Sequence, residues 1–138
     1  MRLSVLLLGF WMAACSPIPV TDIEWKDGDS GIIDGVEFRL KDVDAPETSP
    51  VGDRPGQAKC ELERQRGFAA ADYMRAFTRS ETVTIPRQYG TDRYGRIEVD
   101  LAVGGHDVAE AGLEAGHLKS WRHSNGRPLE NRPDWCSK

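Results

Sequence analysis

Four short segments of the chain carry side chains whose types and spacing could do chemistry on a charged substrate. WKDGDSG occupies residues 25–31, FRLKDVDAPE 38–47, TDRYGR 91–96 and LKSW 118–121. The first two segments are rich in carboxylates. The third places two arginines around a tyrosine, and the fourth holds a lysine and a tryptophan. Together they offer cation ligands, anion-binding groups and a candidate base.

Two of the carboxylates suit a hard cation. Asp29, Asp44 and a backbone carbonyl would form an all-oxygen site of the kind that Ca²⁺ prefers. So few protein ligands leave coordination positions for water and substrate oxygens. The residue types therefore predict a Ca²⁺ site that is open to substrate.

Two arginines and a third carboxylate could supply the remaining chemistry. The guanidinium groups of Arg39 and Arg96 can each hydrogen-bond two phosphate oxygens while negative charge builds up in a five-coordinate transition state. Glu47 could orient or deprotonate the attacking water. A cation, two arginines and one carboxylate suffice for phosphodiester hydrolysis without a covalent intermediate.

Taken singly, each of these residues has a simpler explanation. Asp27-Gly28-Asp29 is typical of a turn, Asp44 could cap a loop, and Arg39 could be a solvated strand residue. Asp42, only two residues before Asp44, is assigned to the ordinary surface. The chemical interpretation depends on the four segments acting together.

The first half of the chain indicates a β region, a loop and a helix. The β region runs from about residue 23 to 43, with Asp34-Gly35 as a hairpin turn. Residues 36–41 alternate apolar and charged side chains, so Arg39 points away from the apolar face. After a loop at 42–59, a helix is expected from about Cys60 to Thr78. Its apolar face is predicted to hold Leu62, Ala69, Ala70, Tyr73 and Phe77, and its solvated face Glu61, Glu63, Arg64 and Arg66.

The second half indicates two more strands and a short helix. Strands are expected at 81–86 and 97–103, and Gly104-Gly105 closes a hairpin. Asp107 is predicted to cap a helix that runs through Leu113 and stops at Gly116. The residues after it are polar and irregular. The fold class expected is α+β, mainly β: a five-stranded OB-type barrel with two or three appended helices.

The N-terminus has the layout of an export signal. MRLSVLLLGFWMAACS joins one basic residue to a short apolar run and then small residues, and the run is too short to span a bilayer. We expect a signal at 1–15, a linker at 16–22 and one domain at 23–138. Cys15 is a candidate for lipidation, with simple cleavage near Ala14 or Cys15 as the alternative. A buried N-terminal strand or helix is the non-export explanation.

The remaining cysteines and the net charge narrow the possibilities. In an exported protein, Cys60 and Cys136 form an even pair and predict a disulfide; two free thiols are the alternative. The formal net charge of −4 counts against a broad basic face for nucleic acid. It still permits a local basic cleft.

Three of the segments, taken in order, resemble motifs of the thermonuclease family, the micrococcal nuclease type. DGDS at 27–30, FRLKDVDAPE at 38–47 and DRYGR at 92–96 carry the resemblance, which spans about residues 22–121. It implies an OB-fold barrel with appended helices that cleaves DNA and RNA with Ca²⁺. The short hairpin before Arg39 and the extra prolines Pro50 and Pro55 depart from the family pattern, which bears on affinity, substrate preference and choice of metal.

The resemblance assigns a role to each matching position. Metal ligation falls to Asp29, Asp44 and the backbone carbonyl of Ala45. Catalysis falls to Glu47 as general base and to Arg39 and Arg96 as phosphate-binding arginines. Substrate contact falls to Tyr94, with Lys119 and Trp121 as further candidates from the fourth segment.

Three functions follow as hypotheses. The first is an exported, monomeric, Ca²⁺-dependent nuclease with little sequence specificity, acting on DNA, RNA or both in the periplasm, on the envelope or outside the cell. The second is a non-catalytic OB-fold module that binds nucleic acid or an envelope partner. The third is a hydrolase of a different phosphodiester.

Overall fold

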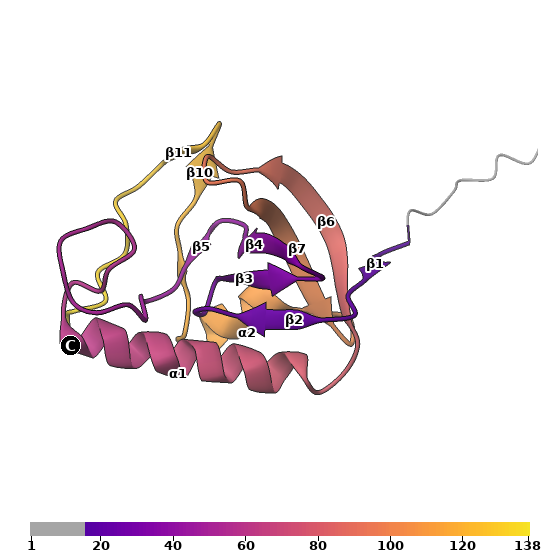
Figure 1. Ribbon diagram of the computed structural model, residues 1–138, viewed down its shortest axis with the longest axis horizontal. Coiled ribbons are helices and arrows are strands. Elements are labelled where there is room, and N and C mark those ends of the chain that lie inside the picture. The colour runs from indigo at the N-terminus through magenta and orange to yellow at the C-terminus, as the bar shows by residue number, and fades with distance from the viewer. Residues whose placement is uncertain (1–15) are drawn as a thin grey trace, which may run out of the picture.

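The computed structural model describes residues 16–138, and the predicted signal at 1–15 with Cys15 lies outside the described residues. The described chain forms a curled, mainly β structure with two helices, in which α1 (Glu61–Thr78) runs along one side of the sheet (Figure 1). Within residues 16–138, no helix combines the length and the apolar character needed to cross a membrane.

One sheet contains most of the strands. Its order is β1-β6-β7-β4-β3-β2, with β8 beside β7, and every pairing is antiparallel except the parallel pair β4 and β7. The strands are β1 (Ile18–Pro19), β2 (Ile23–Trp25), β3 (Ser30–Ile33), β4 (Val36–Leu40), β6 (Val83–Thr91), β7 (Ile97–Val103) and β8 (His106–Asp107). The mainly β, α+β class expected from the sequence is confirmed.

The hairpin between β3 and β4 forms at the predicted turn. Asp34 and Gly35 have φ angles of 47° and 83°, and Ile33 pairs with Val36 across the two-residue loop. Both turn residues need positive φ, which this pair tolerates. The turn sets the register that places Ser30 opposite Arg39.

Residues 18–22 dock onto the sheet, although the sequence indicated a linker at 16–22. β1 pairs with β6, and the Val20 amide donates to the Val83 carbonyl at 2.9 Å. The Asp34 carboxylate accepts hydrogen bonds from the amides of Thr21 and Asp22. An edge strand can be this short because it needs only a few backbone hydrogen bonds to dock, and composition does not reveal them.

Helix α1 begins where predicted, at the N-cap Cys60, but its buried face differs from the expected one. The buried positions are Glu63, Gly67, Ala70, Ala71, Met74 and Thr78. Ala69 is exposed, and Glu63, expected in solvent, is 2% exposed. The helix packs through small residues because it lies close to a loop, and the periodicity of large apolar residues misses such a face.

The second half follows the predicted order with one extension, and with four two-residue strands between residues 106 and 128 that the sequence did not predict. β7 has the predicted bounds, whereas β6 continues to Thr91 through a segment expected to be a turn. Helix α2 (Val108–Glu114) starts at Asp107, whose side chain accepts from the Glu110 amide at 2.7 Å. Gly116 follows with a φ of 75°, as expected for a helix end.

The core lies between the sheet and the two helices. Its largest fully buried apolar side chains are Phe38, Leu40, Met74, Leu101, Val99 and Val108. Trp25 packs edge-on against Phe38, with ring centroids 5.1 Å apart. Because Phe38 and Leu40 point into this core, Arg39 between them points to the opposite face of β4, as predicted.

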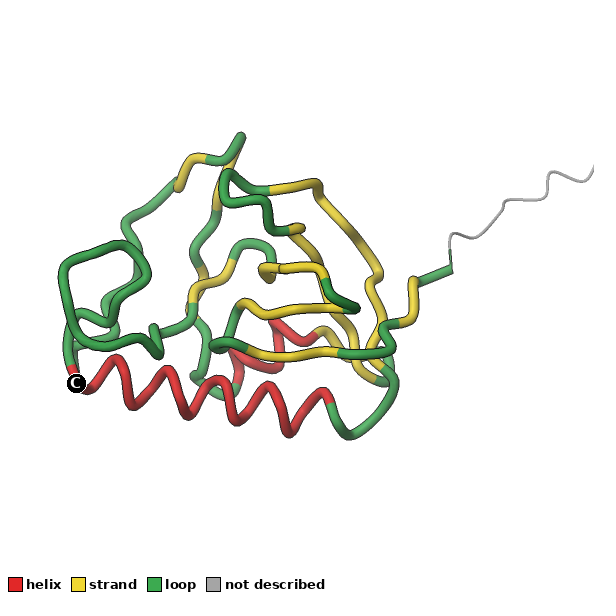
Figure 2. The backbone as a smooth tube through the Cα atoms, viewed as in Figure 1, coloured by secondary structure: helices red, strands yellow, loops and turns green. Residues whose placement is uncertain are grey.

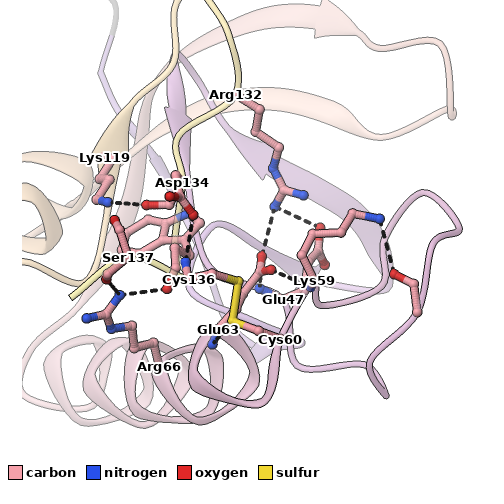
Figure 3. The surroundings of a disulfide bond; sticks show 12 residues. Glu47, Lys59, Cys60, Glu63, Arg66, Lys119, Arg132, Asp134, Cys136 and Ser137 are labelled. Atoms are coloured by element: carbon pink, nitrogen blue, oxygen red, sulfur yellow. Dashed lines mark hydrogen bonds and ion pairs between the residues drawn. A yellow bond between two sulfur atoms is a disulfide. The ribbon is translucent and has the colours of Figure 1, made fainter.

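Two irregular segments meet at one end of the molecule. They are the loop after β5 (Val43–Asp44) and the C-terminal tail, residues 129–138, which ends beside the start of α1 (Figures 1 and 2). The chain reaches this tail through β9 (Lys119–Ser120), which pairs with β5, and the hairpin β10 (His123–Ser124) and β11 (Arg127–Pro128). The predicted disulfide between Cys60 and Cys136 is confirmed (Figure 3).

Candidate functional site

The turn before β3 orients a buried carboxylate toward the loop after β5. One oxygen of Asp27 accepts the backbone amides of Asp29 and Ser30, at 3.0 and 2.7 Å. This local network fixes the turn, and Asp29 is left 4% exposed with its Oδ2 accepting from the Ala45 amide at 2.9 Å. Asp27 is therefore the positioning partner of Asp29 rather than a separate surface acid.

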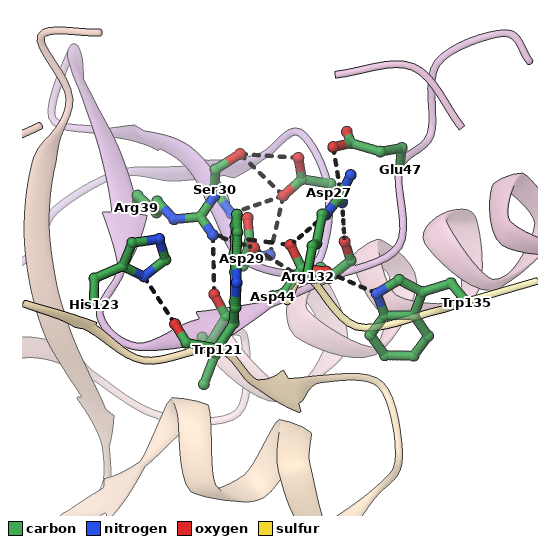
Figure 4. A network of polar contacts seen from close by, with 12 residues as sticks. Asp27, Asp29, Ser30, Arg39, Asp44, Glu47, Trp121, His123, Arg132 and Trp135 are labelled. Atoms are coloured by element: carbon green, nitrogen blue, oxygen red, sulfur yellow. Dashed lines mark hydrogen bonds and ion pairs between the residues drawn. The ribbon is translucent and has the colours of Figure 1, made fainter. Parts of the chain in front are cut away.

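Arg39 lies against the same carboxylates (Figure 4). Its Nη2 is 3.4 Å from Asp29 Oδ2 and 4.0 Å from Asp44 Oδ1, and it donates to the Val43 carbonyl at 3.0 Å. The side chain is 16% exposed. The sequence predicted a cluster of Asp29, Arg39 and Asp44, and the fold brings these three together from the turn before β3, from β4 and from β5.

The loop that carries Glu47 is fixed from below by α1. Gly67 faces this loop so closely that a Cβ there would lie 2.4 Å from the Glu47 carbonyl oxygen, well inside van der Waals contact. Glu63, one turn earlier on the helix, accepts the amides of Glu47 and Lys59 at 3.3 and 2.6 Å. The Glu63 carboxylate is thus buried because it holds the loop, a role that sequence analysis missed.

Arg132 and Trp135 of the tail complete the cluster, and sequence analysis missed both (Figure 4). Arg132 donates from Nε to Asp44 Oδ1 at 2.9 Å, and from Nη2 to the Ala45 carbonyl at 3.2 Å and Glu47 Oε1 at 3.0 Å. The Trp135 indole N–H donates to Asp44 Oδ2 at 2.8 Å. One signal could have found them: the predicted disulfide at Cys136 brings the neighbouring tail residues to the loop before Cys60.

Trp121 lies beside both guanidinium groups. The Arg39 and Arg132 carbons Cζ are 5.6 and 6.0 Å from the Trp121 ring centroid, within cation–π range. The Trp121 amide donates to the Asp42 carbonyl, and the His123 amide to the Asp42 carboxylate. Asp42, with a φ of 58°, is therefore an anchor for this segment, and its assignment to the ordinary surface is wrong.

The other predicted site residues lie apart from this cluster. Arg96 pairs with Asp92, its Nε 2.8 Å from Oδ2, in the turn between β6 and β7. Tyr94 is 61% exposed in the same turn, between the guanidinium groups of Arg93 and Arg96. Lys119 faces the tail, donating to the Asp134 carbonyl at 2.6 Å.

The cluster holds more carboxylates than cations. Two guanidinium groups, of Arg39 and Arg132, lie within 4.0 Å of four carboxyl groups, those of Asp29, Asp44, Glu47 and Glu63, and the Asp27 carboxylate accepts from the Asp29 amide beside them. Burial, and then the charge of Asp29, raises the pKa of Asp27 to about 7. Burial also raises the pKa of Asp44 and of Glu47, although Arg132 opposes the rise in both. Such excess acid in a buried site favours an added cation.

The donor set suits a hard cation only if Arg132 moves. Asp29, Asp44 and the Ala45 carbonyl provide oxygen ligands from two adjacent loops. Across residues 16–138, no three His, Cys, Asp or Glu side chains converge as a ready metal group. The oxygens of Asp44 and Ala45 bind Arg132 and Trp135, so the residue chemistry fits Ca²⁺ while the tail holds the same atoms.

Comparison with known proteins adds no relative to this description. No protein-family model matches the sequence, and no curated protein matches it significantly.

Proposed function

We propose that the protein is an exported, Ca²⁺-dependent nuclease that hydrolyses phosphodiester bonds of DNA and RNA with little sequence specificity. The observation that carries the proposal is the position of Arg39, within 4.0 Å of the buried carboxylates of Asp29 and Asp44. Glu47 lies at the edge of the same cluster, with its side chain 20% exposed. A phosphate-binding group, cation ligands and a base that solvent can reach thus occupy one face.

Glu47 is the general base of the proposed reaction. Its carboxylate is partly open to solvent, so a water molecule can bind it. Burial raises its pKa, which makes the ionised carboxylate a better proton acceptor near neutral pH. Glu63 and the close contact with Gly67 hold the loop, so the carboxylate is positioned before substrate arrives.

Arg39 binds the non-bridging phosphate oxygens. Burial would lower the pKa of this guanidinium, but the charges of Asp29 and Asp44 raise it overall, so the group stays cationic. Asp29, Asp44 and the Ala45 carbonyl would hold Ca²⁺, which when bound supplies positive charge at the phosphodiester. The chain therefore binds the phosphate through a fixed planar donor rather than through a mobile surface lysine.

Arg96 and Tyr94 are assigned by their match to the DRYGR motif. Glu98 is the register partner of Arg39 in the parallel pair of β4 and β7. Arg96 comes two residues before Glu98, and alternate residues of an extended chain share a face. Arg96 lies just outside β7 and pairs with Asp92, so binding a phosphate beside Arg39 would require it to leave Asp92.

We infer an OB-type barrel from the strand order. The meander β2-β3-β4, the parallel step from β4 to β7 and the antiparallel return to β6 give five strands. Residues 18–25 pair with β6 at one end and with β3 at the other, which would close the ring. A partly open five-stranded barrel of this kind suits oligonucleotide binding.

A non-catalytic binding module is the alternative, and Arg132 is the observation that favours it. If the tail never leaves Asp44, Ala45 and Glu47, the protein would bind a nucleic acid or an envelope partner without cleaving it. The disulfide supports an oxidising location for either function.

A cleavage assay tests the proposed function. We expect the purified protein lacking residues 1–15 to shorten single-stranded DNA and RNA in excess Ca²⁺ and to stop when a chelator is added. Gel electrophoresis of end-labelled oligonucleotides would follow the products. Intact DNA and RNA under every metal condition would reject the nuclease and leave the binding module.

A further inference from the structure

The tail binds the atoms that the proposed function needs free. Arg132 spans Asp44, the Ala45 carbonyl and Glu47, while Trp135 takes the second oxygen of Asp44 (Figure 4). Two candidate cation ligands and the candidate base are therefore all hydrogen-bonded to one seven-residue stretch, residues 130–136.

Arg132 and a divalent cation exclude one another at these oxygens. A guanidinium donates hydrogen bonds and accepts none. It therefore binds the carboxylate and carbonyl oxygens as a positive group, in the place that a metal cation would take. Placing both positive groups on Asp44 and Ala45 would set like charges in contact in a buried site, where repulsion is strong. Binding of the metal thus requires Arg132 to leave.

Separate contacts keep the tail in place. Arg66 of α1 donates to the carbonyls of Trp135 and Ser137 at 2.6 and 2.8 Å, and Lys119 donates to Asp134 (Figure 3). The disulfide joins the tail to Cys60, the N-cap of α1. After Arg132 leaves, this tether keeps it close, at an effective concentration on the order of millimolar.

We propose that residues 130–136 are an intrachain plug, in which Arg132 competes with Ca²⁺ for Asp44 and Ala45 and thereby sets the metal affinity of the site. The inference rests on the proposed function, whose substrate must reach the same face. The plug is in place without metal and is displaced when metal binds. The apparent affinity for metal is lowered by the fraction of molecules that are plugged.

Calcium titration of the metal-free protein tests the plug without using catalysis. We expect Arg132→Gln to bind Ca²⁺ about tenfold more tightly than the unmodified protein in isothermal titration calorimetry. Arg127→Gln is the matched control, because Arg127 is an exposed arginine of β11, outside residues 130–136; its Ca²⁺ affinity should be unchanged. Equal or weaker Ca²⁺ binding by Arg132→Gln would overturn the plug.

Two further measurements guard against a misfolded variant. Arg132→Lys keeps the charge but cannot bridge three oxygens, so it should also bind Ca²⁺ more tightly, by a smaller factor. In the unmodified protein, saturating Ca²⁺ should speed hydrogen exchange in a peptide covering 130–136; unchanged exchange would contradict displacement.

If every protein binds Ca²⁺ as expected and none cleaves nucleic acid, the plug stands and the nuclease fails. If the unmodified protein cleaves nucleic acid but Arg132→Gln binds Ca²⁺ no more tightly than it does, the nuclease stands and the plug fails.

Discussion

The two sides of the candidate site are held in different ways. Arg39 lies on β4, which is hydrogen-bonded to strands on both sides and flanked by fully buried Phe38 and Leu40. Arg132 lies in a tail that has no sheet partner at that point and is held by side-chain contacts and one disulfide. Two arginines that share the Asp44 carboxylate therefore differ in how much structure must change before they move.

This difference separates a sheet side, which is fixed by strand pairing and core packing, from a tail side that can be displaced. Moving Arg39 would break strand pairing and expose core, which costs much of the stability of a small domain. Moving Arg132 and its neighbours breaks polar contacts to Asp44, Ala45 and Glu47 and uncovers Trp135, which is 4% exposed, but it leaves the sheet intact. Changes on the sheet side should consequently abolish activity, and changes on the tail side should alter access.

The largest effect is expected at Glu47. Glu47→Gln removes the base but retains an oxygen that accepts from Arg132, so we expect cleavage to fall about 10²–10⁴-fold with little change in stability. The rate at saturating Ca²⁺ and the thermal midpoint would be measured together. Glu61→Gln, an exposed carboxylate that pairs with Arg64, is the control. Activity within a few-fold of the original would show that Glu47 is not the base.

A smaller loss of activity is expected at Arg39. Arg39→Lys keeps a positive charge beside Asp29 but cannot bind two phosphate oxygens in a plane, so cleavage should fall about 10²-fold. Arg79→Lys changes an exposed arginine at the end of α1 and should have no effect. Steady-state kinetics on one oligonucleotide would compare them. If Arg39→Lys instead changed Ca²⁺ affinity without lowering the cleavage rate, as a tail variant is expected to do, the contrast between the two sides would be lost.

The smallest effect is expected for the ion pair of Arg96 with Asp92, which lies on neither side of the candidate site. Burial would raise the pKa of Asp92, but hydrogen bonds from Arg96 and the Tyr94 amide lower it overall. A carboxyl group whose pKa is lower in the folded state stabilises the fold at pH values above its unfolded-state pKa. This stabilisation is lost as the pH falls through the folded-state pKa. Asp92→Asn should lower the free energy of unfolding by about 1–2 kcal/mol at pH 7.

Urea unfolding at several pH values would measure this difference. It should shrink as the pH falls below about 4, because the Asp92 carboxylate of the unmodified protein then becomes protonated. Asp53→Asn, an exposed carboxyl group in the loop before α1, should leave the unfolding energy unchanged. A difference that stays constant with pH would contradict a role for the Asp92 charge.

Local patterns predicted much of the sheet side. The Asp34-Gly35 turn, the bounds of β7 and the Asp107 cap depend on residues within a few positions of one another, and the structure confirms them. The cluster of Asp29, Arg39 and Asp44 was also predicted, from the residue types and the motif resemblance taken together, and the structure places these three side chains close to one another.

The tail side could not be predicted because its contacts are distant in sequence. Arg132 meets Asp44 across 88 residues, and Trp135 meets it across 91. The tail has no hydrophobic periodicity, so nothing local indicates which of its residues turn inward. Glu63 was misplaced for a related reason: its burial depends on two loop amides, whereas helix periodicity considers only apolar side chains.

Gly67 makes the spacing along α1 part of the geometry of the candidate site. Gly67, which has no side chain, lets the helix pack against the backbone of Pro46 and Glu47, so the spacing from Cys60 to Gly67 sets the position of the candidate base relative to the disulfide. Inserting one residue between them would rotate Gly67 by about 100° and present a bulky neighbour to the loop. Homologous chains of this type should therefore vary in length at either end of α1 and keep the number of residues between the cysteine and the glycine constant.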